Sequence, residues 1–133
     1  MNEIVDFLTD VFKDVSKPVA LSEPIISQSD IGSVQETLEK GYVSSLGGSI
    51  DDFEKQISKN FDDRYAVCLN SGTSALHLAL NSMGVESNQE VIVQPLTFVA
   101  TINAIRYLGA TPTFIDIEQD YLSLSHEHLK NFI

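Results

Sequence analysis

The sequence predicts an α/β fold in which a parallel-type sheet is flanked by helices. After residue 64, short apolar runs alternate with helix-like segments, and glycines close those segments. Strand, helix, strand, helix, strand is typical of right-handed βαβ units. The chain has 133 residues, 43% of them hydrophobic and 20% charged, which indicates a globular domain with a core.

The first part of the chain is expected to be a helix followed by an arm. Apolar residues recur at helical spacing over about residues 3 to 15, and an extended arm with Pro24 in its middle follows. We therefore assign residues 1–29 to a helix and arm, and residues 30–133 to an incomplete large domain.

Two further helices are expected before residue 64. Asp30 can cap the first, which Gly41 closes. A loop follows at residues 42–49, and Ser49 with Asp52 resembles the N-cap pair of the second helix.

The alternating elements follow residue 64. The apolar runs predict strands at residues 65–69, 90–95 and 111–117. The segments between them predict helices at residues 73–83 and 97–109, and Ser125 is expected to cap a last helix. Within this pattern Cys68 is expected to be buried, and Leu76, Leu80 and Met83 are expected to form a core stripe.

Charge and composition exclude several classes of function. The formal charge of −11 disfavours nucleic acid as a partner. No apolar run approaches the roughly 20 residues that span a bilayer, so we expect a cytoplasmic protein without membrane contact. A single cysteine, Cys68, excludes an internal disulfide. No metal site is expected, because His126 and His128 are two residues apart and would face different ways on a helix.

The stretch "NSGTS", residues 70–74, stands between the first expected strand and its helix. Helix N-termini favour anions, Gly72 would let a phosphate approach the backbone, and Thr73 and Ser74 would add hydroxyl donors. An ordinary capped helix explains the same residues equally well. The spaced glycines and lysine of a nucleotide P-loop are missing.

Phe98 occupies the equivalent place after the next expected strand. An aromatic residue there is most often part of the core, but it can also stack on a flat cofactor ring. A phosphate-binding turn and a ring platform at adjacent strand ends would suit a phosphorylated aromatic cofactor.

Three motifs together give a resemblance to a known family. They are "YVSSLGGSIDDFE", "YAVCLNSGTSALHLAL" and "VIVQPLTFVATINAIRYLGATPTFIDI". In order and spacing they resemble the N-terminal part of the pyridoxal-phosphate-dependent sugar aminotransferases of the DegT/DnrJ/EryC1/StrS family, which have the aspartate-aminotransferase-like (fold type I) large domain. The resemblance runs from about Val19 to Ile117, and is greatest to the branch acting on 4-keto sugars for bacillosamine-, legionaminate- or perosamine-like products.

The resemblance implies a role for each matching residue. Gly72, Thr73 and Ser74 would bind the phosphate of pyridoxal 5'-phosphate, and Phe98 would stack on its ring. The loop residues Val43, Ser44, Ser45 and Gly47 would line the nucleotide-sugar site, with Ser45 in direct contact. The implied partners are a nucleotide sugar, an amino-acid donor such as glutamate, and a second copy in a homodimer.

No catalytic residue is assigned within the chain. In the family, the Schiff-base lysine and the acidic partner of the pyridine nitrogen lie downstream of the matched segment, so this chain alone is expected not to transaminate. Asp116 is expected to be structural. Two alternatives stay open: a pyridoxal-phosphate-dependent sugar dehydratase on the same scaffold, and a small non-catalytic domain that binds a phosphorylated ligand or a partner chain.

Overall fold

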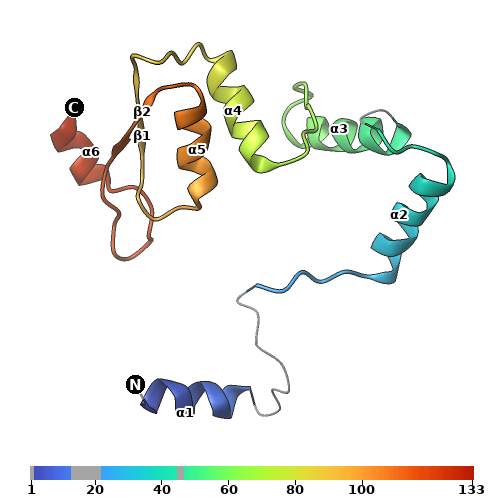
Figure 1. Ribbon diagram of the computed structural model, residues 1–133, viewed down its shortest axis with the longest axis horizontal. Coiled ribbons are helices and arrows are strands. Elements are labelled where there is room, and N and C mark those ends of the chain that lie inside the picture. The colour runs from blue at the N-terminus through green and yellow to red at the C-terminus, as the bar shows by residue number, and fades with distance from the viewer. Residues whose placement is uncertain (1, 13–21, 45–46) are drawn as a thin grey trace. The chain divides into compact units, whose positions relative to one another are not determined.

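The computed structural model describes residues 2–12, 22–44 and 47–133 of the chain (Figure 1). Two compact units are present, residues 1–50 and residues 51–133. The functional boundary expected between residues 29 and 30 stays a prediction. None of the helices in the described part of the chain has the length and apolar character needed to span a bilayer.

The first unit contains α1 (Asn2–Val11) and α2 (Gln28–Glu39), with non-helical residues 22–27 leading into α2. The N-cap of α2 is Ser27, so the expectation that Asp30 caps this helix is wrong. Asp30 stands at the third helical position, where its carboxylate accepts a hydrogen bond from the Ser27 N–H at 2.7 Å. The Ser27 hydroxyl accepts one from the Asp30 N–H at 3.2 Å, which completes a capping box.

Gly41 ends α2 as expected. Its φ of +77° is in the left-handed region, and its N–H donates to the Leu38 carbonyl at 2.9 Å while the Tyr42 N–H donates to Thr37 at 3.1 Å. This pair of bonds is a Schellman motif. The next helix, α3 (Gly48–Asn60), begins before the expected cap, so Ser49 lies inside its first turn.

The second unit is built on a two-stranded parallel sheet. Its strands are β1 (Glu90–Val93) and β2 (Thr111–Phe114), paired from Glu90↔Thr111 to Val93↔Phe114. α5 (Val99–Tyr107) connects them, which makes a βαβ unit. α4 (Gly72–Ser82) contacts α5, and α6 (His126–Phe132) follows the sheet with Ser125 as its N-cap, as expected. The predicted α/β class with a parallel sheet is confirmed.

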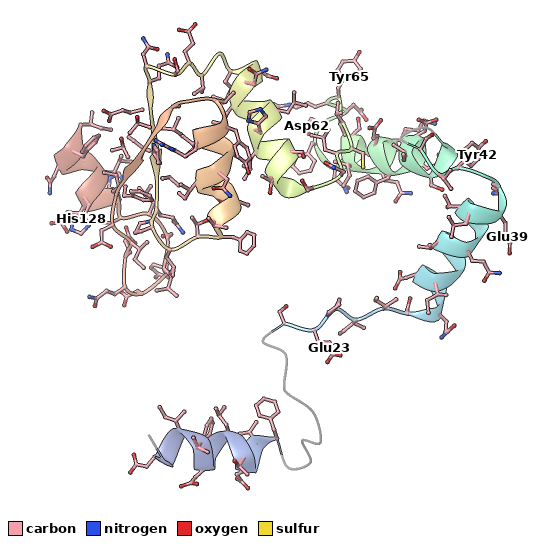
Figure 2. All side chains as sticks on the ribbon, viewed as in Figure 1. Glu23, Glu39, Tyr42, Asp62, Tyr65 and His128 are labelled. Carbon is pink, nitrogen blue, oxygen red and sulfur yellow. The ribbon has the colours of Figure 1, made fainter. Side chains whose placement is uncertain are left out.

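The strand expected at residues 65–69 is wrong. The segment has no regular secondary structure, and Tyr65 is fully exposed at its start (Figure 2). Cys68 is exposed rather than buried, and its N–H donates to the Glu54 carboxylate at 2.7 Å. A strand needs the backbone of a second strand, and the described sheet consists of β1 and β2 alone.

The core of the second unit lies between the sheet, α5 and α4. Val93, Ile105 and Ala110 are buried, and half-buried apolar residues pack around them: Leu80, Val85, Val91 and Ile102. The expected stripe on α4 is therefore wrong for two of its three members, because Leu76 is 42% exposed and Met83 is 80% exposed. Only the part of α4 that faces the core cluster is covered.

Candidate functional site

The candidate site lies where α4 and α5 begin. The two helices contact each other, and both start on the side of the second unit at which β1 leads into α5 (Figure 1). At a helix N-terminus the first N–H groups have no partner within the helix, and the helix dipole adds partial positive charge. Two such ends on one side of a small domain make a surface that favours an anion.

Three side chains cap α4. The N-cap is Ser71, whose hydroxyl oxygen accepts a hydrogen bond from the Ser74 N–H at 3.2 Å. The Ser74 hydroxyl donates to the Asn70 side-chain oxygen at 2.9 Å and lies 3.1 Å from the Ser71 hydroxyl. Because the Ser74 proton is used toward Asn70, the Ser71 hydroxyl is the donor to Ser74. The sequence pattern S-x-x-S, which our sequence reasoning did not single out, is the signal for this cap.

The cap leaves Gly72 and Thr73 available. Their N–H groups are among the first of α4 and have no intrahelical acceptor, whereas the Ser74 N–H is bound by Ser71. A Cβ atom added at Gly72 would meet nothing within 4 Å. The capped helix and the anion-binding turn, posed as alternatives, are thus compatible: the cap uses Asn70, Ser71 and Ser74, and the open surface belongs to Gly72 and Thr73.

Phe98 is at the start of α5, as expected. It is the N-cap residue, with no side-chain cap bond, and its side chain is 79% exposed. The interpretation of Phe98 as a core residue is therefore wrong. The preceding turn is fixed locally, since Thr97 N–H donates to the Pro95 carbonyl at 3.0 Å and the hydroxyls of Thr97 and Thr101 are 3.0 Å apart. An accessible phenyl ring on a fixed turn can stack against a flat ligand ring.

The loop proposed for the nucleotide sugar belongs to the first unit. Val43 is 79% exposed, and Ser45 lies outside the described residues. Gly47 has φ +153°, and a Cβ there would lie 3.2 Å from the Tyr42 ring. Both the backbone angle and the ring therefore favour glycine at this position. Tyr42 (Figure 2), which sequence reasoning passed over, is the residue that packs against Gly47.

Two other polar residues have structural contacts. His77 is half-buried, with Nδ1 3.4 Å from the Ala104 carbonyl and its ring in an edge contact with Tyr107 at 6.0 Å. Asp116 accepts hydrogen bonds from the N–H groups of Ile117, through its carboxylate, and Ser125, through its carbonyl, both at 2.8 Å. The contacts of His77 connect α4 to α5. The bond from Ser125 to Asp116 connects the N-cap of α6 to the segment that follows β2.

The model of the DegT/DnrJ/EryC1/StrS aminotransferase family matches residues 24–133. Among curated proteins, GDP-perosamine synthase of Escherichia coli O157:H7 is 37% identical over 82% of this chain and 30% of its own length. The spore coat polysaccharide biosynthesis protein SpsC of Bacillus subtilis is 43% identical over 77% of this chain and 26% of its own. The chain therefore spans less than a third of the length of these relatives.

Solved structures show the same fold. A Streptococcus pneumoniae protein named as a sugar aminotransferase, Spr1654, in its PLP-form, matches with a TM-score of 0.76 and 33% identity over 86% of this chain and 29% of its own. The E. coli GDP-4-keto-6-deoxy-D-mannose-3-dehydratase with bound hydrated PLP gives 0.74 at 22% identity, over 87% of this chain and 31% of its own, which is a likeness of fold. The expected fold type I large domain is confirmed, as is pyridoxal 5'-phosphate as the cofactor of full-length members.

Proposed function

Because the chain belongs to the DegT/DnrJ/EryC1/StrS aminotransferase family, we propose that it forms part of an enzyme that transfers an amino group to a nucleotide-linked keto sugar. Glutamate is the proposed donor, and surface-polysaccharide biosynthesis the proposed context. The names of the two curated relatives, a GDP-perosamine synthase and a spore coat polysaccharide biosynthesis protein, support this substrate class.

The observation that carries the proposal is the pairing of an open helix N-terminus with an exposed aromatic ring. Gly72 leaves room for an anion to reach the backbone of α4, and Phe98 is exposed at the start of the neighbouring helix α5. The residues present therefore fit pyridoxal 5'-phosphate, which supplies an electron sink for reaction at the amino-bearing carbon when it is bound.

Five residues at the starts of α4 and α5 have separate roles in binding the cofactor. The N–H groups of Gly72 and Thr73 and the Thr73 hydroxyl donate to phosphate oxygens. Ser74 and Ser71 hold the first turn of α4 in the geometry that presents those donors. Ser74 reaches the phosphate by giving up its 2.9 Å bond to Asn70. Phe98 stacks on the ring and excludes water from one of its faces.

The substrate loop completes the proposed assignments. Val43, Ser44, Ser45 and Gly47 line the nucleotide-sugar site, and Ser45 makes the direct contact. A second copy of the chain completes the active site in a homodimer. None of the residues assigned here supplies the amine nucleophile, so we propose that the chain alone holds cofactor without transaminating, in a cytoplasmic setting.

Pyridoxamine 5'-phosphate is the probe that tests this site, because it cannot form an imine with lysines. Calorimetric titration of the full chain should show saturable binding, with pyridoxamine, which lacks the phosphate, binding at least tenfold more weakly. Thr73→Val removes a hydrogen bond to a charged group, worth about 1.5 kcal/mol, and should weaken binding about tenfold. Thr111→Val, an exposed threonine on β2, is the control.

Phe98→Leu tests the stacking separately. Loss of an aromatic contact of about 1 kcal/mol should weaken binding of pyridoxamine 5'-phosphate roughly fivefold and leave that of inorganic phosphate unchanged. The control is Phe61→Leu, a ring that is also exposed. If wild type binds pyridoxamine 5'-phosphate and inorganic phosphate equally well, the non-catalytic phosphate-binding domain is favoured. If wild type binds no pyridoxamine 5'-phosphate, the proposed site is rejected. The alternative function, a sugar dehydratase, is supported by a likeness of fold alone.

A further inference from the structure

One histidine on α4 makes a polar contact with α5. His77 is half-buried, and its Nδ1 lies 3.4 Å from the backbone carbonyl oxygen of Ala104. Because a carbonyl oxygen only accepts hydrogen bonds, Nδ1 carries the proton and donates. The two residues are 27 positions apart and belong to the two helices whose first turns form the candidate site. His77 therefore bridges those two helices directly.

The carbonyl of Ala104 needs a donor from outside α5. Ala104 is 0% exposed, and it is one of the last four residues of the helix, whose carbonyl oxygens have no donor within the helix. The Leu108 N–H, which would ordinarily donate to Ala104, donates to the Ile105 carbonyl at 3.1 Å. A buried carbonyl that is left without a donor destabilises the fold. The bond from His77 supplies that donor.

The ring of Tyr107 orients the His77 imidazole. Tyr107 follows Ala104 by one turn of α5, and the two rings meet edge to face, with centroids 6.0 Å apart and planes at 75°. This contact restricts rotation of the imidazole and keeps Nδ1 directed at Ala104. The apolar packing of Leu80 against the cluster around Ile105 has no preferred direction, whereas a hydrogen bond does. The bridge therefore adds a fixed point to the packing of the two helices.

The bridge joins the two helices at nearly equal distances from their starts. His77 is five residues after Gly72, which is about 7.5 Å along an α-helix. Ala104 is six residues after Phe98, which is about 9 Å. Both helices start on the same side of the second unit (Figure 1). A slip of one residue between them would move the ring by about 1.5 Å relative to the turn, an error that matters for a ligand contacting both.

We infer that His77 is a positioning residue, which sets the register of α4 against α5 and thereby the distance between the Gly72 turn and the Phe98 ring. It acts through the two helices, because its Nδ1 is bound to Ala104. The inference rests on the proposed function, since the register matters to a ligand that contacts both helix starts. Pyridoxamine 5'-phosphate is such a ligand, whereas inorganic phosphate would contact the turn alone.

Calorimetric titration of the full chain with these two probes tests the role. His77→Phe keeps an aromatic ring beside Tyr107 and removes the Nδ1 donor. It should weaken binding of pyridoxamine 5'-phosphate about threefold, because the Phe98 ring is misplaced rather than lost, and leave binding of inorganic phosphate unchanged. His77→Asn puts an amide N–H where Nδ1 stands, so it should restore binding to within about twofold of wild type.

A double-mutant cycle separates positioning from stability. The Phe98→Leu chain has no ring to position, so adding His77→Phe to it should not weaken binding of pyridoxamine 5'-phosphate further. Val91→Ala is the control, because it removes core contacts of β1 and should lower stability while keeping the ratio of the two affinities. If circular dichroism shows His77→Phe to be unfolded, Tyr107→Leu takes its place. That variant releases the imidazole and should give a selective loss of about twofold.

Three results would overturn the positioning role and leave the proposed function standing. The first is an equal change, or none, in the affinities for the two probes when the bridge is removed. The second is an undiminished effect of His77→Phe in the Phe98→Leu chain. The third is binding by His77→Asn that is no better than that by His77→Phe. If wild type binds no pyridoxamine 5'-phosphate, the proposed function fails together with the positioning role.

Discussion

Residues 51–133 and residues 1–50 contrast in where their apolar side chains lie. The second unit buries Val93, Ile105 and Ala110 between a sheet and two helices, whereas no described residue up to Ile50 is buried. Yet α2, in the first unit, has a complete capping box and a Schellman motif. Local hydrogen bonds are sufficient to define a helix, but burial requires a surface contributed by another element.

The largest expected effect is at the centre of the buried cluster. Ile105 is 2% exposed, so Ile105→Ala should lower the free energy of unfolding of the second unit by about 2–5 kcal/mol through lost burial and a cavity. Urea denaturation followed by circular dichroism measures it. Val43→Ala in the first unit, at a site 79% exposed, should change stability by less than about 0.5 kcal/mol. Similar losses for both variants would remove the contrast between the units.

Two helix-ending glycines separate backbone strain from packing. Gly84 and Gly109 have φ of +79° and +75°, and an added Cβ meets open space at Gly84 but lies 2.9 Å from the Ser87 Cβ at Gly109. Gly84→Ala should cost about 1 kcal/mol from the left-handed backbone alone. Gly109→Ala should cost about 2–3 kcal/mol, because a close contact adds to that strain. The same urea denaturation experiment compares the two variants. Equal losses in the free energy of unfolding would mean that Ser87 moves away from the added Cβ at no cost.

The cap of α4 should have a smaller effect. Ser71→Ala removes the acceptor of the Ser74 N–H and should cost about 1 kcal/mol. It should also weaken pyridoxamine 5'-phosphate binding, because Gly72 and Thr73 are presented by that turn. Ser82→Ala, at the other end of the same helix, is the control. Weakened binding in both variants would show that overall stability, rather than the turn, controls the ligand.

The smallest effect is a pH dependence of α2. The Ser27 hydroxyl and N–H donate to Asp30 and hold the pKa of its carboxyl below the ordinary value of 3.8. A lowered pKa means that the stabilisation is complete above pH 3.8 and is lost as pH falls through the value in the folded helix. Backbone chemical shifts of residues 28–39 should report helix loss in that range. Asp30→Ala should flatten the change, whereas Glu39→Ala, outside the capping box, should leave it intact.

Much of the site follows from the sequence, and the rest does not. The sequence predicts that the turn at Gly72 and the ring at Phe98 stand at the starts of two successive helices, and both do, although the strand expected before Gly72 is not formed. The sequence does not tell which of residues 70–74 cap α4 and which stay open, because a hydroxyl that caps a helix and one that binds a ligand look the same in a sequence. The sequence also leaves the exposure of Phe98 open, since an aromatic residue at a helix start fits either a core or a surface.

The sequence by itself determined the helices, their glycine ends and the Ser125 cap, because helix hydrogen bonds and caps join residues within a few positions of one another. Only the tertiary structure decided that residues 90–93 form a strand while the equally apolar residues 65–69 do not, and that Leu80 is covered while Met83 is exposed. The physical reason is that strand pairing and burial both depend on a second surface, which lies far along the chain.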